Sequence, residues 1–88
     1  MGTRARLLTP EALILRALER GPLRAKELEE KVNLPKSTLY RSLDELQLAG
    51  LIRRHEQGTA VYYEITSEGR KALARARAEL AAAPASTA

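Results

Sequence analysis

Apolar residues recur at helical spacing along most of this chain, and the spacing changes to alternation in one segment. The clearest helical stretch has Leu39, Leu43 and Leu46 at i, i+4 and i+7, so these residues share one face of a helix. Gly50 follows at i+11, where a left-handed conformation would end the helix. The pattern therefore predicts an amphipathic helix over about residues 36–49.

Two shorter helices are predicted before this one. Thr9-Pro10-Glu11 offers a hydroxyl cap, a proline suited to the first helical position and an acid in the first turn, which predicts a helix over about 10–20. A second helix is predicted over about 25–32, with Asn33 closing it in a left-handed conformation. Leu23, between the two helices, allows a single short β-bridge.

The alternating segment follows the third helix. Val61, Tyr63 and Ile65 share one face of a predicted strand, and residues 51–56 supply its partner. Gly58 provides a positive φ in the turn between them. The segment is therefore predicted to form a β-hairpin directly after the third helix.

A last helix is predicted over about 67–82, capped by Thr66 or Ser67. The order is helix, helix, helix, strand, strand, helix, which predicts a mainly α fold with a small β-hairpin: a winged helix-turn-helix whose hairpin is the wing. The chain then divides into an N-terminal arm (1–8), the winged helix-turn-helix (9–66), a C-terminal helix that can dimerise (67–82) and a flexible tail (83–88).

Composition narrows the class of protein. The 88 residues allow one small domain, and 44% hydrophobic with 30% charged residues favours a globular chain. There is no cysteine, which excludes a disulfide scaffold and thiolate metal sites and agrees with a reducing cytoplasm. No apolar run approaches the roughly 20 residues that a membrane span needs, so no membrane partner is expected.

The net charge of +4 suits a polyanionic partner, but the excess lies at the two ends. Over residues 9–50, seven basic residues cancel seven acidic ones. The surplus comes from the arm and from the last helix, whose basic residues are predicted to form a solvated face: Arg70, Lys71, Arg75 and Arg77. Charge alone is therefore weak evidence for nucleic acid.

Two stretches resemble known regulators. IclR-type regulators have a helix-turn-helix similar to Leu34-Pro35-Lys36-Ser37-Thr38-x-x-Arg41-x-Leu43-x-x-Leu46-x-x-x-Gly50-Leu51-Ile52. PadR-type repressors resemble the chain at Thr38-Leu39-Tyr40 and at Tyr62-Tyr63-Glu64-Ile65-Thr66-Ser67-Glu68-Gly69-Arg70-Lys71-Ala72-Leu73, and MarR-type proteins share the arrangement. The match covers about residues 10–75. It implies a protein that binds a specific sequence in double-stranded DNA as a dimer, with the third helix in the major groove and the wing beside the minor groove.

Candidate DNA contacts follow from this arrangement. The first turn and a half of the third helix carries donors suited to base edges and phosphates: Lys36, Ser37, Thr38, Tyr40 and Arg41. Arg41 can donate bidentately to guanine, and Thr38 can alternatively cap its own helix. The wing adds Arg53, Arg54, Gln57, Gly58 and Thr59. The alternative is that both sets are ordinary solvated surface.

The remaining candidates are weaker. A seam of small and apolar residues packs either on the first helix or on a second subunit: Leu7, Leu8, Leu73, Ala76 and Leu80. His55 is the only histidine, so neither a metal site nor another cofactor is expected. The chain has no Ser-His-Asp set and no glycine-rich phosphate loop, which argues against an enzyme.

These observations favour a cytoplasmic transcriptional repressor that binds DNA as a homodimer. Two alternatives remain: a winged helix that assembles with another protein, and a non-specific architectural binder of DNA or RNA. The first is supported by the neutral charge of residues 9–66 and by the acidic second helix, and the second by the basic ends. A pocket for a small effector is expected only at a dimer interface.

Overall fold

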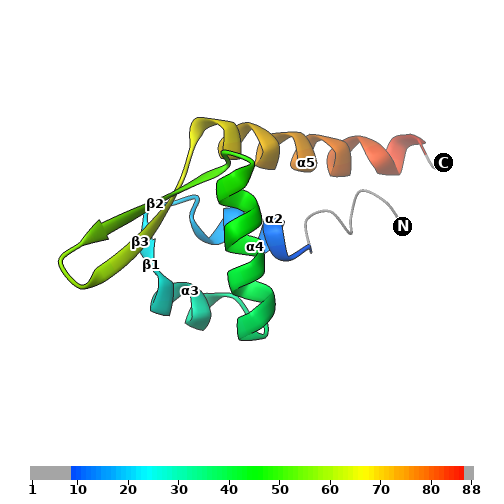
Figure 1. Ribbon diagram of the computed structural model, residues 1–88. Coiled ribbons are helices and arrows are strands. Elements are labelled where there is room, and N and C mark those ends of the chain that lie inside the picture. The colour runs from blue at the N-terminus through cyan, green and yellow to red at the C-terminus, as the bar shows by residue number, and fades with distance from the viewer. Residues whose placement is uncertain (1–8, 87–88) are drawn as a thin grey trace.

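The structure is a computed structural model that describes residues 9–86, with the side chains of residues 9–79. The described part contains four helices and three strands (Figure 1). In chain order they are α2 (Pro10–Ala17), β1 (Leu23–Arg24), α3 (Ala25–Lys31), α4 (Lys36–Leu48), β2 (Ile52–Gln57), β3 (Ala60–Ile65) and α5 (Ser67–Ser86). This order confirms the predicted winged helix-turn-helix.

Three helix ends differ from the prediction. Helix α2 stops at Ala17, and Leu18 to Arg20 form a turn that places Leu18 in the core. The left-handed cap predicted at Asn33 is wrong, because every described residue with positive φ is a glycine. The chain leaves α3 instead at Val32, which is extended (φ −102°, ψ 132°) and buried, as suits a β-branched side chain. Helix α5 continues to Ser86, four residues past the predicted end, and so includes Pro84 in its last turn.

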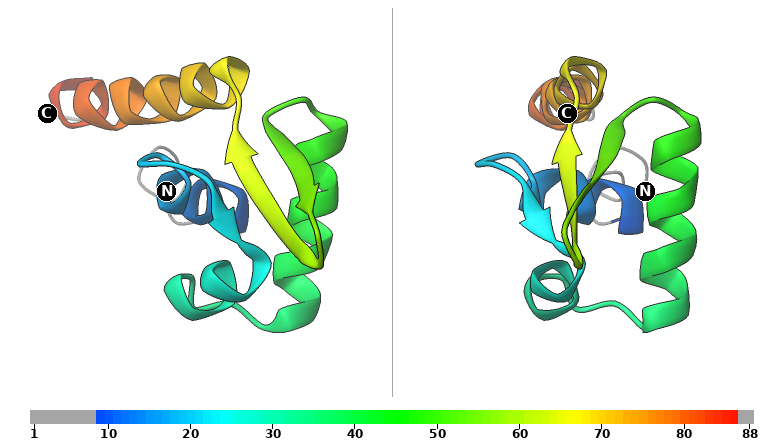
Figure 2. Two further views of the ribbon diagram at one scale, coloured as in Figure 1. Left: turned by 90° about the vertical axis from the view of Figure 1, so that its left-hand side faces the viewer. Right: turned by 60° about the vertical axis from the view of Figure 1, so that its left-hand side comes forward.

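The core is mainly aliphatic and lies where the helices meet the sheet. Helix α2 lies between α5 and α3, with α4 beside it (Figure 2). The predicted apolar faces are the ones that are buried, and six large core residues are almost inaccessible to solvent: Ile14, Leu18, Leu28, Leu39, Leu43 and Leu46. Each fully buried side chain of this size contributes roughly 1.5–3 kcal/mol through removal from water.

The three strands form one antiparallel sheet in the order β1-β3-β2. The predicted bridge at Leu23 is confirmed, since β1 pairs with β3 through Leu23 opposite Tyr63. Strands β2 and β3 are joined by a two-residue loop in which Gly58 has φ 58°. Positive φ at the first loop residue alone is the arrangement of a type II′ hairpin, so Gly58 has the predicted role.

The base of the wing is tied to the end of α4 and the start of α5. The backbone N–H of Thr66 donates to the Leu51 carbonyl (3.0 Å), and its hydroxyl donates to the Gly50 carbonyl (2.7 Å). The same hydroxyl accepts from the Gly69 N–H (3.0 Å), which caps α5 at Thr66. Because one side chain joins these segments, the wing and α5 have fixed positions relative to α4.

Candidate nucleic-acid interface

Helix α4 begins without a side-chain cap. Its N-cap is Pro35, which is extended and offers no side-chain acceptor, so the first-turn N–H groups remain free. In α2 and α5 a first-turn N–H donates to a side chain, Thr9 and Thr66 respectively, and in α3 Glu27 accepts from the N–H of the N-cap residue Arg24. The alternative that Thr38 caps α4 is therefore wrong. Free N–H groups at the positive end of a helix dipole form a ready site for an anion such as phosphate.

The predicted contact residues on α4 are mostly at the surface. Lys36, Ser37 and Arg41 are exposed, while Thr38 is half-buried. Within residues 9–79, no carboxylate pairs with Lys36 or Arg41. The first turn of α4 contains no acid. Two cations with unused donors therefore project beside the open helix end.

Tyr40 differs from the other α4 candidates. Its hydroxyl donates to the Glu29 carboxylate on α3 (2.6 Å), and its side chain is 38% exposed. The hydrogen bond to Glu29, with partial burial, raises the pKa of Tyr40 to about 12. The sequence suggested that this hydroxyl contacts the DNA backbone, or that the ring packs on the wing or on a partner chain. In the structure the hydroxyl joins the two helices of the helix-turn-helix, and the contact with DNA stays a prediction.

We expect Tyr40→Phe to lower the free energy of unfolding by about 1 kcal/mol, because it removes one hydrogen bond to a charged group that is partly exposed to water. Since the folded pKa lies above the ordinary value of 10, this contribution is present below pH 10 and is lost as the pH rises toward 12. Urea unfolding of both proteins at pH 8 and pH 11.5 measures the difference. An unchanged difference at the two pH values would argue against the hydrogen bond.

The wing carries one paired and one unpaired arginine. Arg54 contacts Glu56 on its own strand (2.5 Å), and hydrogen bonds to Glu56 and Tyr63 raise the pKa of Arg54. Arg53 lies on the opposite face of the hairpin, is exposed, and has no carboxylate partner among the described residues. The turn residues Gln57, Gly58 and Thr59 are exposed at the tip.

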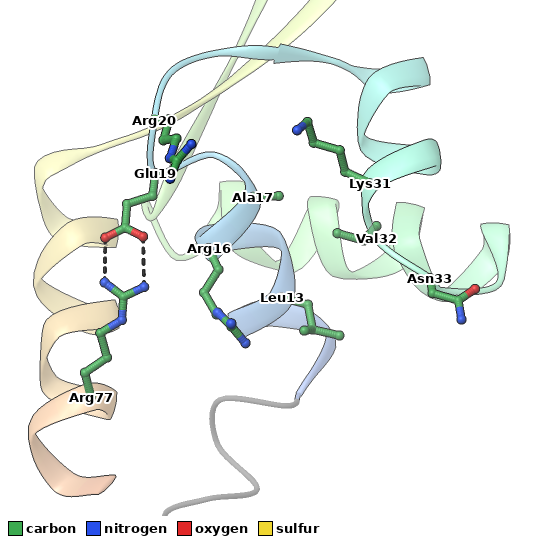
Figure 3. Close-up of a pocket in the computed structure, with 9 residues that line it drawn as sticks. All are labelled: Leu13, Arg16, Ala17, Glu19, Arg20, Lys31, Val32, Asn33 and Arg77. Atoms are coloured by element: carbon green, nitrogen blue, oxygen red, sulfur yellow. Dashed lines mark hydrogen bonds and ion pairs between the residues drawn. The ribbon is translucent and has the colours of Figure 1, made fainter. Parts of the chain in front are cut away.

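The predicted solvated face of α5 needs one correction. Arg77 forms a bidentate pair with Glu19, in the turn after α2, at 2.5 and 2.8 Å (Figure 3). This pair lowers the pKa of Glu19. Arg70, Lys71 and Arg75 are exposed as predicted. Arg77 thus fastens α5 to the body of the domain, a contact between residues 58 positions apart in the chain.

The candidate dimer residues divide into two groups. Leu73 is 3% exposed and belongs to the core of its own chain, so it packs within the chain and not on a second subunit. Ala76 is half-buried. Leu7 and Leu8, together with the side chain of Leu80, lie outside the described residues.

His55 contacts Glu64 (2.8 Å) across the hairpin, and no three metal-ligating side chains converge within the described residues. None of the helices in residues 9–86 is both long and apolar enough to cross a membrane.

Comparison with known proteins gives the family. Residues 7–85 match the HVO_A0261 N-terminal domain. The chain finds no match among curated proteins.

Three solved structures are similar at 26% sequence identity. A MarR-family transcriptional regulator from Silicibacter pomeroyi superposes with a TM-score of 0.78, over 91% of this chain and 60% of its own. A PadR-family transcription regulator from Clostridium difficile R20291 superposes with a TM-score of 0.73, over 80% of this chain and 84% of its own. The transcriptional regulator BldR from Sulfolobus solfataricus also superposes with a TM-score of 0.73, over 89% of this chain and 63% of its own.

The chain thus spans less than two thirds of the MarR-family protein and of BldR. All three relatives are named as transcriptional regulators and not as enzymes, which agrees with the resemblance in the sequence. Since the family match covers most of the sequence, the chain belongs to the HVO_A0261 N-terminal domain family and has the fold of winged-helix transcriptional regulators.

Proposed function

We propose that this chain is a sequence-specific double-stranded DNA-binding regulator that acts as a repressor. In this proposal the start of α4 enters the major groove, and the wing lies along the adjacent minor groove. The observation that carries the proposal is the uncapped start of α4 with unpaired Lys36 and Arg41 beside it. The free N–H groups and Lys36 suit phosphates, and Arg41 suits a guanine edge. The transcriptional regulators of similar fold support the same interpretation.

Selection of bound duplexes from a random pool tests this proposal whatever the sequence of the operator. We expect one motif to be enriched, and a palindromic motif would indicate a dimer. A pool that gains no motif after successive rounds would oppose sequence-specific binding.

The structure gives less support to a protein-assembly function. One of its two supports is the acidity of α3, but two of the three acidic residues of this helix have partners within the chain. Glu27 accepts from the Arg24 backbone N–H (2.8 Å), and Glu29 accepts from Tyr40 (2.6 Å). These carboxylates thus have structural roles that account for their presence.

We propose that the wing arginines contribute unequally to DNA binding. Arg53→Ala is expected to weaken binding and to reduce the slope of log K against log salt by about 0.9, the amount expected for one phosphate contact. Arg54→Ala is expected to change the slope less, because Arg54 is already paired with Glu56. Binding titrations at several salt concentrations measure both slopes, and equal losses in the two variants would contradict this assignment.

We further propose that the regulator is a homodimer that uses α5. Helix α5 extends beyond the rest of the domain toward its C-terminal end (Figure 1). Ala76, half-buried on this helix, is a small residue through which two helices can approach closely. Sedimentation of the wild type and of Ala76→Arg tests this directly: we expect a dimer that the arginine weakens, and a monomeric wild type at micromolar concentration would oppose it.

A further inference from the structure

An open pocket of about 640 Å³ lies between α2, α3 and α5 (Figure 3). Its apolar part consists of Leu13, Ala17 and Val32, which belong to the core or pack against it. Its volume is within the range of about 300–1,000 Å³ that is typical of small-molecule sites. The α4 ribbon lies behind the pocket in Figure 3, so the pocket opens away from the exposed face of α4.

The polar lining of the pocket is cationic. It comprises four basic residues, Arg16, Arg20, Lys31 and Arg77, one acidic residue, Glu19, and the uncharged Asn33. Both carboxylate oxygens of Glu19 accept hydrogen bonds from Arg77. Arg20 and Lys31 are exposed, and within residues 9–79 neither has a carboxylate partner. In Figure 3 the Lys31 side chain extends across the opening toward the side on which Arg20 lies.

Helix dipoles account for only part of this arrangement. Arg16 and Lys31 lie in the last turns of α2 and α3, where a cation is favourable regardless of any ligand. Arg20, however, lies in the turn after α2 and belongs to no helix. The dipoles also give no reason for an apolar surface beneath these charges. Helix dipoles alone therefore do not explain why the unpaired Arg20 and Lys31 meet at one opening above an apolar surface.

We propose that this pocket binds a small amphipathic anion. The apolar body of the ligand rests on Leu13, Ala17 and Val32, and its anionic head group is held by Arg20 and Lys31. An arginine fork and a lysine ammonium both suit a carboxylate or a phosphate ester. The site lies within a single chain, whereas the sequence led us to expect an effector pocket only at a dimer interface.

The first test uses two fluorescent probes of nearly the same shape in the full chain. 8-Anilino-1-naphthalenesulfonate carries a negative charge, and N-phenyl-1-naphthylamine lacks it. We expect saturable 1:1 binding of the anionic probe, at least about tenfold tighter than that of the neutral probe, because the head group forms charge-assisted hydrogen bonds. Equal affinity for the two probes would overturn the proposal and leave only an apolar patch.

A pair of double variants separates the pocket from overall charge. Arg20→Gln with Lys31→Gln removes the two unpaired cations, and Lys26→Gln with Arg75→Gln removes two exposed cations elsewhere. We expect the first pair to weaken binding of the anionic probe by about tenfold or more and the second to change it little. Equal weakening in both would overturn the proposal. All four positions are exposed, and thermal unfolding followed by circular dichroism verifies that the variants fold.

Competition identifies the head group. Decanoate and decyl phosphate are each titrated against the bound anionic probe, with decanol as the uncharged control. The stronger of the two anionic competitors identifies the preferred head group, and decanol is expected to displace nothing. Displacement by decanol equal to that by the anions, or displacement by none of the three, would overturn the proposal.

Discussion

Replacing Gly69 with alanine is expected to lower the free energy of unfolding by about 3 kcal/mol, the upper end of the usual cost of overpacking. A Cβ at this position would lie 2.1 Å from the Leu51 carbonyl oxygen and 2.7 Å from the Ile65 Cγ1 atom. The first of these is a backbone atom, so no side-chain rotation relieves the clash. The same carbonyl accepts from the Thr66 N–H, and displacing it disturbs the base of the wing.

The sign of this effect separates packing from helix propensity. Within a helix, glycine to alanine ordinarily adds up to about 1 kcal/mol of stability, and Gly69 lies in α5. A small domain has only about 5–15 kcal/mol of total stability, so the predicted loss should be plain in urea unfolding followed by circular dichroism. A variant as stable as the wild type, or more stable, would contradict the close contact between α5 and Leu51.

Replacing Arg41 with alanine is expected to weaken specific DNA binding by about 5- to 150-fold, the range that corresponds to about 1–3 kcal/mol for one bidentate base contact. Arg41 is exposed and has no partner among the described residues, so its loss should leave the fold intact. Fluorescence anisotropy with the duplex enriched by selection measures the change, and thermal unfolding verifies the fold.

Arg70→Ala is the matched control for this experiment. Arg70 is also exposed, and its removal changes the net charge by the same amount, but it lies on α5 away from the start of α4. We expect its effect on specific binding to stay within about twofold, because a single charge far from the duplex is largely screened. Equal losses in the two variants would mean that charge, and not base contact, governs binding.

The helices and the hairpin were predictable because local patterns determine them. Leu39, Leu43 and Leu46 lie on one face in the sequence and on one buried face of α4. The alternation of β3 and the positive φ of Gly58 were equally local. Such signals depend on residues a few positions apart, and the sequence contains them in full.

The contacts that the sequence did not reveal join distant segments. Tyr40 and Glu29 lie on different helices, and Arg77 reaches Glu19 across most of the chain. The spacing of residues along the chain cannot show that either pair meets, so neither contact was predicted. The left-handed cap predicted at Asn33 was wrong for a related reason. Burial of Val32 in the core, and not the local preference of asparagine, decides how α3 ends.

Gly69 is an intermediate case. Its place in the motif shared with PadR-type proteins was visible in the sequence. The reason for a glycine there is the Leu51 carbonyl, which only the packing of α5 brings close. The cations of the pocket could likewise be seen one by one in the sequence, but only the fold brings Arg20, in the turn after α2, and Lys31, at the end of α3, to the same opening.

The most direct test of the central claim compares two duplexes by fluorescence anisotropy. One is the duplex most enriched by selection, and the other is a scrambled duplex of the same composition, each titrated at about 50 and 200 mM salt. Sequence-specific reading by α4 predicts a preference for the enriched duplex that persists at the higher salt concentration. Equal binding to both duplexes that collapses at the higher salt concentration would contradict it and indicate a non-specific binder of polyanions.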